Sequence, residues 1–266
     1  MQTRSQRRRL EAAKTRASPP SSSLPSRLAP EIVDLVIDFL RGDIQSLKSC
    51  SLVCKSWYPR CRYHLFRSIR IPGKWVSVFL QSLRSTPSEI ITTLEIGGSY
   101  WRPTKKIWAG IALNVPAIQS LTLTRVDLRR VSAASLVGLK LKHLAFEYSR
   151  GYTLRDFAQI ACSFPHLEIL KFNECYFSSI PGQTIERLPQ TLHKLIVLLE
   201  RPRSTQILEW VAIHDPLPLI KTLSMKTDAS LWRDFATMFG DTLERLTLVQ
   251  AYGFPIPAGM DARFCL

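Results

Sequence analysis

The chain of 266 residues has no apolar run long enough to cross a membrane and no apolar segment near its start that would direct secretion. Its six cysteines form no CxxC pair, and no paired histidines stand near them to complete a zinc site. A glycine-rich phosphate loop, a G-x-S-x-G elbow and an H-E-x-x-H helix are also missing. We therefore expect an intracellular protein, cytoplasmic, nuclear or both. We expect it to have reduced and mostly packed thiols, no cofactor, no metal site, no membrane contact and no catalysis of its own.

Acidic residues are scarce, with 21 Asp and Glu against 36 Lys and Arg and a net charge of +15. The basic excess is densest in residues 1–27, where Arg4, Arg7, Arg8 and Arg9 precede a run rich in Ser and Pro at 18–23. We expect a disordered basic tail there. Its arginines are a solvated cluster or, alternatively, a nuclear-localisation or nucleic-acid patch. A mitochondrial transit peptide is disfavoured because the arginines are clustered rather than spread around a helix.

Residues 28–70 carry the signals of three short helices. Pro30 suits the first helical position, and apolar residues follow at helical spacing at positions 32, 35, 36 and 39. Gly42 is expected to end this helix, Asp43 to cap the second, and Pro59 to end the run. A unit of roughly 45 residues is near the lower limit for independent folding. We expect one apolar face to be covered by a partner or by the rest of the chain.

The order and spacing of residues in this segment resemble the F-box of fungal F-box proteins of the basidiomycete type. The resemblance lies in Leu28-x-Pro30-Glu31-Ile32, Ser51-Leu52-Val53-Cys54-Lys55-x-Trp57 and Tyr63-His64-Leu65-Phe66, with Ala29 in place of a proline common in the family. In that family the motif binds the SKP adaptor of a cullin–RING ubiquitin ligase. The resemblance implies that the following residues contact the adaptor: Leu28, Pro30, Ile32, Leu52, Val53 and Trp57. The alternative for each of them is a purely structural role in packing the three helices.

From residue 91 onward, a six-residue pattern with apolar first, fourth and sixth positions occurs seven times. The copies begin at Ile91, Ile118, Leu141, Leu167, Leu192, Ile220 and Leu243. Their spacing of 23 to 28 residues matches leucine-rich repeats, which have one strand and one helix or turn per unit. Apolar runs at 157–160, 207–211 and 231–239 are expected to form the outer helices. The ninth position, often Asn or Cys in such repeats, fits only at Cys175, so we expect irregular repeats.

The predicted fold is α/β, with a three-helix F-box followed by an irregular leucine-rich-repeat solenoid that has a parallel β-sheet on its concave face. The predicted parts are a basic tail at 1–27, the F-box at 28–70, a helical linker at 71–89 and the repeats at 90–266.

Residues between the leucines of each predicted strand point away from the core. The expected substrate-binding residues are Glu95, Thr122, His143, Lys171, Lys194, Ser224 and Arg245. Apolar Ala145, Ile169 and Ile196 lie among them, which suits a protein better than nucleic acid.

Together these features predict a non-catalytic substrate adaptor of an SKP–cullin–F-box ubiquitin ligase. The F-box would bind the SKP adaptor, and the repeats would bind an unidentified protein substrate. One alternative is an F-box scaffold that works outside any ligase, and another is a basic nucleic-acid-binding protein built on the tail.

Residues 252–266 either cover the last strand as a loop or reflect a truncated gene model. Cys265 has too few residues after it for prenylation.

Overall fold

The computed structural model describes residues 29–83, 88–129, 138–178, 187–200, 203–213, 218–226, 239, 242–249 and 263–265. The chain is α/β and divides into two compact units, Met1–Arg62 and Tyr63–Leu266. We call them the helical unit and the sheet unit. Leu28 and the basic tail at 1–27 lie outside the described residues. Among the described helices, none is both long and apolar enough to span a membrane.

The helical unit contains α2 (Pro30–Phe39), the 3-10 turn Leu40–Gly42, α3 (Ile44–Val53) and the start of α4 (Tyr58–Arg67). Pro30 occupies the first turn of α2, as predicted. The predicted cap is also confirmed, since the Asp43 carboxylate accepts hydrogen bonds from the backbone N–H groups of Gln45 and Ser46 at 3.0 and 3.1 Å. The prediction that Pro59 ends the run was wrong. Pro59 lies in the first turn of α4, where a residue without N–H leaves no bond unmade.

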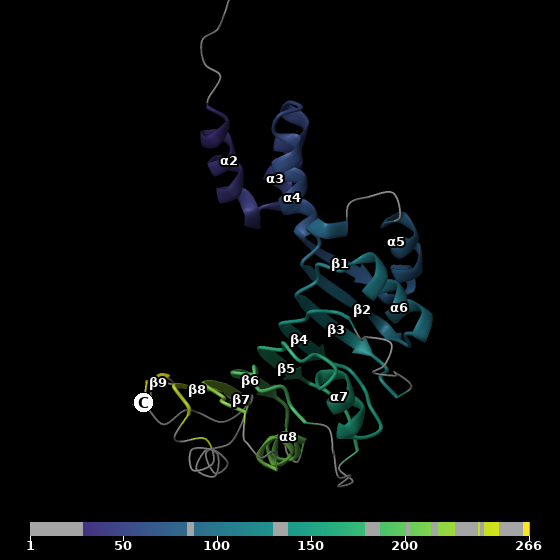
Figure 1. Ribbon diagram of the computed structural model, residues 1–266, viewed down its shortest axis with the longest axis vertical. Coiled ribbons are helices and arrows are strands. Elements are labelled where there is room, and N and C mark those ends of the chain that lie inside the picture. Colours follow the sequence, from purple (N-terminus) through teal and green to yellow (C-terminus); the bar gives the residue numbers. More distant parts are fainter. Residues whose placement is uncertain are drawn as a thin grey trace, which may run out of the picture. The chain divides into compact units, whose positions relative to one another are not determined.

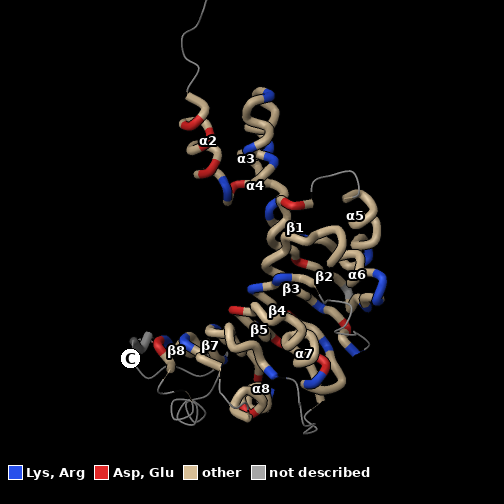
Figure 2. The backbone as a smooth tube through the Cα atoms, in the orientation of Figure 1, with Lys and Arg blue, Asp and Glu red and all other residues tan. Residues whose placement is uncertain are grey.

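The helical unit has a small core. Ile37, Leu47 and Cys61, one from each helix, are fully buried. An ion pair also joins α2 to α4, because the Arg60 Nε donates to Asp38 Oδ1 at 2.6 Å. Figure 2 shows acidic residues along α2, whereas the charged residues of α3 and α4 are Lys and Arg, which matches this pairing. The three helices are therefore held by few buried contacts and by one bidentate salt bridge.

The sheet unit is built on a sheet whose nine described strands lie side by side in chain order. The first eight pair in parallel and the last is antiparallel (Figure 1). The strands are β1 (Ser68–Pro72), β2 (Thr93–Trp101), β3 (Ser120–Val126), β4 (His143–Glu147), β5 (Ile169–Asn173), β6 (Lys194–Leu198), β7 (Thr222–Lys226), β8 (Arg245–Val249) and β9 (Arg263–Cys265). The parallel strands predicted from the seven hexamers are thus present, as β2 to β8.

Two strands were not predicted. β1 belongs to an eighth copy of the hexamer, Phe66-x-x-Ile69-x-Ile71, which begins 25 residues before Ile91. The sequence analysis had placed these residues in the helical segment 28–70, whereas the structure divides the chain after Arg62. β9 pairs along β8, where the sequence analysis expected a loop or a truncated end.

The parallel pairing places equivalent residues of each hexamer in straight rows. The fourth-position residues Ile69, Leu94, Leu121, Leu144, Leu170, Leu195, Leu223 and Leu246 pair in succession across the sheet. In the first five residues of β3 and throughout β4 to β7, residues at even positions of each strand are buried and those at odd positions are not. One face of the sheet is therefore core and the other, which we call the open face, is accessible.

Helices cover the core face (Figure 1). They are α5 (Val76–Ser82), α6 (Lys105–Asn114), α7 (Leu154–Ala161) and α8 (Arg203–Ala212), with 3-10 turns at Gly73–Trp75 and Ser88–Ile90. The helices expected at 157–160 and 207–211 are confirmed as α7 and α8, and the segment 71–89, expected to be helical, contains α5. The helix expected at 231–239 lies outside the described residues except for Phe239, and α6 was not predicted.

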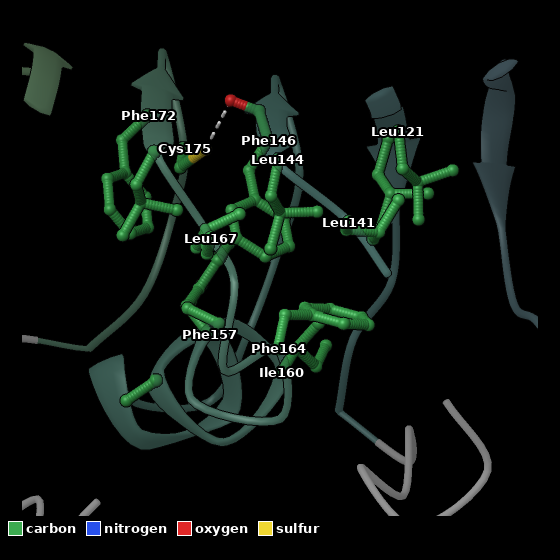
Figure 3. Close-up of a cluster of buried hydrophobic side chains, with 14 of the residues drawn as sticks. Leu121, Leu141, Leu144, Phe146, Phe157, Ile160, Phe164, Leu167, Phe172 and Cys175 are labelled. Carbon is green, nitrogen blue, oxygen red and sulfur yellow. Dashed lines mark hydrogen bonds between the residues drawn. The ribbon is translucent and has the colours of Figure 1, made fainter. Parts of the chain in front are cut away.

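Aromatic side chains fill the core between β4, β5 and α7 (Figure 3). Phe146 stacks on Phe172 with ring centroids 5.5 Å apart, and the ring of Phe157 meets that of Phe146 edge-on at 5.1 Å. Phe157 and Phe164 are fully buried. Each repeat alone would expose these rings, so burial of the apolar surface requires the neighbouring repeat.

Two small buried side chains tie consecutive repeats together after the strands. The Ser149 hydroxyl donates to the carbonyl of Leu123 at 2.9 Å and accepts from the N–H of Val126 at 3.2 Å. The Cys175 thiol donates to the carbonyl of Phe146 at 3.3 Å (Figure 3). Both stand at the ninth repeat position. Ser149 therefore fills this position and bonds to the preceding repeat as Cys175 does, although only Cys175 fitted the expected residue types there. Each follows a residue with a left-handed backbone, Tyr148 or Glu174.

We expect Ser149→Ala to lower the free energy of unfolding by about 1–3 kcal/mol, because it leaves a buried N–H and a buried carbonyl without their side-chain partner. Urea unfolding followed by circular dichroism measures the change. Ser163→Ala is the matched control, since its hydroxyl only bonds back to the carbonyl of Gln159 in the preceding helical turn. Equal effects of the two substitutions would contradict a role for Ser149 in linking repeats.

Candidate interaction sites

The first candidate site is an apolar surface on the helical unit. Four residues of α2 at helical spacing, Ile32, Leu35, Val36 and Phe39, are all exposed, and Phe39 is 90% exposed. We call this set the apolar helix face. Ile37, on the opposite side of α2, is buried. The stripe predicted from the sequence therefore forms, but it faces outward rather than into the core of the unit.

The predicted adaptor-contact residues are mostly accessible as well. On α3, Leu52 is 85% exposed, and Val53 and Ile44 are exposed too. Pro30 and Ile32 are exposed, Trp57 is half-buried, and Leu28 lies outside the described residues. Leu35, Val36 and Phe39 were predicted as apolar helix positions but not as contacts. The signal that could have added them is their spacing, which puts them on the same face as Ile32.

The predicted substrate-binding residues lie in two adjacent rows on the open face of the sheet. One row contains His143, Lys194 and Arg245, and the other contains Glu95, Thr122, Lys171 and Ser224. His143 and Arg245 are exposed and the other five are half-buried. The parallel register therefore brings all seven residues onto one surface, together with Ala145, Ile169 and Ile196.

Many charges on and beside this surface are already neutralised by neighbours. Glu95 pairs with Arg70 at 2.8 Å, and Lys171 pairs with Glu147 at 2.6 Å. Partial burial, together with neighbouring cations such as Lys142, lowers the pKa of His143, so its imidazole is neutral at pH 7. The two rows thus offer a mixed surface of low net charge, which is chemically suited to a protein partner.

A second candidate site, which the sequence analysis missed, lies where the strands end. The end of β2, the residues after β3, β4 and β5, and the first residue of α8 place tyrosine and arginine side chains against one another. Arg150 lies over the ring of Tyr100 at 3.9 Å, Arg129 over Tyr152 at 5.0 Å, and Arg203 over Tyr176 at 5.1 Å. We call these six residues the arginine–tyrosine cluster: Tyr100, Arg129, Arg150, Tyr152, Tyr176 and Arg203. Backbone β-bridges of Arg150 to Asp127 and to Tyr176 further link the successive repeats at this site.

Asp127 is the carboxylate that forms ion pairs with arginines at this site. It is 6% exposed and accepts a bidentate pair of bonds from Arg129, at 2.6 and 2.7 Å, and one from Arg102 at 2.7 Å. The hydrogen bonds from Arg129, followed by that from Arg102, hold the pKa of Asp127 well below its usual range despite burial. The same bonds raise the pKa of Arg129. Asp127 therefore stays ionised and fixes Arg129 in place.

Two neighbouring cavities open onto the cluster. The larger, of about 410 Å³, is lined by Arg102, Lys105, Asp127, Arg129 and Tyr152 among others. The smaller, of about 310 Å³, is lined by Arg129, Arg150, Arg203, Tyr152 and Tyr176 among others. Arg129 and Tyr152 contribute to both cavities. The site is therefore a basic, aromatic-lined hollow that extends over several repeats.

The repeat alignment contains the signal that would have found this cluster. Counted from the start of each hexamer, Tyr100, Arg150 and Tyr176 are tenth residues, and Arg129, Tyr152 and Arg203 are twelfth residues. The sequence analysis followed the repeats only to the ninth position. Because parallel strands end at one edge of the sheet, residues at equal offsets beyond each strand gather there.

Comparison with known proteins adds no assignment. No protein-family model matches the chain, and no curated protein matches its sequence significantly. Among the described residues, no group of three or more His, Cys, Asp or Glu side chains is arranged to hold a metal ion. The two surfaces described above are therefore interpreted from their own chemistry.

We expect Asp127→Asn to destabilise the protein at pH 7 by about 1 kcal/mol, because an amide is uncharged and has one acceptor oxygen, so it cannot accept both bonds of the bidentate pair from Arg129. Asp127 has a folded-state pKa below its unfolded value of about 3.9, so its contribution to the free energy of unfolding is present above that pH and is lost as the pH falls. The difference in unfolding free energy between Asp127→Asn and wild type should therefore become smaller between pH 5 and about pH 3. Urea midpoints of both proteins, measured across this pH range, test the prediction. Glu209→Gln, at an exposed position of α8, controls for the lost charge, and a difference constant with pH would contradict the pairing.

Proposed function

We propose that this protein is a substrate adaptor of an SKP–cullin–F-box ubiquitin ligase, whose helical unit binds the SKP adaptor and whose repeats hold a protein substrate. The observation that carries the proposal is the apolar helix face. Four apolar side chains at helical spacing are exposed on a unit whose three helices bury only Ile37, Leu47 and Cys61 fully. Such a surface favours burial by another protein.

The sequence supports the choice of partner. The apolar helix face and Leu52 belong to the segment that resembles an F-box, and the two helix-start signals of that segment, Pro30 and Asp43, begin α2 and cap α3 as its residues predicted. The repeated hexamers give a mostly parallel sheet with an open face, which is an arrangement that leucine-rich-repeat solenoids use for docking. Two binding surfaces on one chain, one for the adaptor and one for the substrate, are what an adaptor subunit needs.

The proposed mechanism is proximity. The chain would perform no chemistry, and it would hold a substrate beside the conjugating enzyme that the ligase recruits. Tethering replaces a bimolecular encounter by an effectively intramolecular one, which raises the local concentration of substrate lysines to roughly the millimolar range. The predicted rows around Glu95, Lys171 and Lys194 on the open face would hold the substrate.

Leu52→Asp should abolish co-purification of the SKP adaptor with the full chain, because a charge placed at a desolvated contact costs several kcal/mol. Leu113→Asp is a closely matched control. Leu113 is a leucine of α6 in the sheet unit that is 80% exposed, so the same charge is introduced at similar solvent exposure. Equal adaptor recovery from wild type, Leu52→Asp and Leu113→Asp would remove the assignment of the helical unit.

Co-purification of a cullin and of ubiquitinated proteins, with a proteasome inhibitor present, distinguishes a ligase subunit from a scaffold. The expected result is recovery of the SKP adaptor together with a cullin, and loss of both from the Leu52→Asp chain. Recovery of the SKP adaptor without any cullin would instead assign a role outside the ligase.

A further inference from the structure

The arginine–tyrosine cluster contains cations that the rest of the described chain leaves without a counter-ion. Arg102 and Arg129 share the carboxylate of Asp127. Arg150 and Arg203 have no ion pair among the described residues, and each stacks on tyrosine instead. Together with the neighbouring Arg102 and Asp127, the cluster therefore brings together four guanidinium groups, of which only two are ion-paired with the Asp127 carboxylate.

Stacking orients these guanidinium groups for binding. A guanidinium that lies over an aromatic ring keeps its plane fixed, while its N–H donors remain at the edge. Arg150 is held between two rings, at 3.9 Å from Tyr100 and 5.9 Å from Tyr176. Arg129 is held by its bidentate bonds to Asp127. Guanidinium groups that are already held in place suit bidentate binding of an oxyanion, because little side-chain entropy is lost when the oxyanion binds.

The charge excess indicates a ligand with more than one negative charge. The smaller cavity is lined by Arg129, Arg150 and Arg203, and no acidic side chain is among its lining residues. One carboxylate would neutralise only one of these cations. A phosphate monoester carries a charge of about −1.5 to −2 at pH 7 and three acceptor oxygens, which matches several converging donors.

The length of the site indicates a polypeptide rather than a small ion. The two cavities together run from residues that follow β2 to the start of α8, which comes after β6. Four strand spacings of about 4.8 Å give about 19 Å, the length of about six extended residues at about 3.3 Å each. The larger cavity is then available to residues that flank the phosphate.

Two observations disfavour nucleic acid. Base stacking needs free aromatic faces, and the rings of Tyr100, Tyr152 and Tyr176 are already stacked on arginine. A phosphate backbone also needs basic residues beyond one cluster. Here the neighbouring cations Lys171 and Lys226 are paired with glutamates, at 2.6 and 2.9 Å.

We propose that the arginine–tyrosine cluster binds a phosphorylated segment of another protein, with the phosphate in the cavity lined by Arg129, Arg150 and Arg203. The flanking residues of the segment extend along the strand ends toward Asp127. The site differs from the rows on the open face that were predicted to bind a substrate. The proposal does not rest on adaptor binding by the helical unit, since the cluster lies wholly in the sheet unit.

The test uses the purified full chain, without any adaptor, immobilised and exposed to three oriented peptide pools. The seven-residue pools are degenerate except at a central phosphoserine, phosphothreonine or phosphotyrosine, and matched pools lack the phosphate. At least one phosphorylated pool should be retained about tenfold more than its counterpart, as one to three charge-assisted hydrogen bonds allow. Arg150→Gln and Arg203→Gln should each reduce that retention toward the unphosphorylated level. Arg41→Gln removes an equivalent charge from the helical unit and should leave retention unchanged.

Three outcomes would overturn the proposal. The first is equal retention of phosphorylated and unphosphorylated pools. The second is phosphate-dependent retention that survives both substitutions in variants whose melting temperatures match that of the wild type. The third is preferential binding of a seven-nucleotide single-stranded RNA pool that the same substitutions abolish, which would assign the cluster to nucleic acid. None of these results depends on whether the SKP adaptor binds, so the two proposals fail separately.

Discussion

Parallel pairing in a common register, which shifts between β2 and β3 only after Gly97, is the constraint on which the parallel strands of the sheet unit depend. Because Leu94 pairs with Leu121, Leu121 with Leu144, and so on across β8, each position of the repeat becomes a row that crosses the sheet. A slip of one residue would turn every buried leucine to the open face. The same register that builds the core also aligns the residues beyond each strand. The arginine–tyrosine cluster therefore arises from the architecture of the core, without a separate motif.

The two units manage apolar surface in opposite ways. In the sheet unit, Phe146, Phe157 and Phe172 are buried because each repeat covers its neighbour. In the helical unit, three short helices have no neighbours of this kind, so Phe39 and Leu52 remain exposed. The repeats thus complete their own core, whereas the helical unit presents apolar side chains outward. This contrast is the physical basis for our proposals that the adaptor binds the helices and that other ligands bind the repeats.

The sequence was a good guide wherever spacing alone determines structure. The hexamers predicted strands β2 to β8, and Pro30 and Asp43 predicted helix starts. The failures have physical reasons. Pro59 suits a first turn as well as it ends a helix, and Phe66, Ile69 and Ile71 could not be recognised as a repeat once they were assigned to the helical segment. The pairing of Arg150 with Tyr100 was missed because it joins residues 50 positions apart at the tenth repeat position, beyond the ninth position to which the repeats were followed. The role of Ser149 likewise became visible only with the carbonyl of Leu123 beside it.

The hydrogen bond from Cys175 to Phe146 has a chemical consequence for the whole protein. Burial raises the pKa of this thiol to about 12, so it stays protonated, and only the protonated form can donate the bond. Alkylating agents and peroxides react with thiolates, and they must also reach the sulfur. Cys54 is exposed at the end of α3, whereas Cys175 is enclosed between repeats. Electrophiles will therefore modify Cys54 before Cys175 and leave the sulfur that joins two repeats intact.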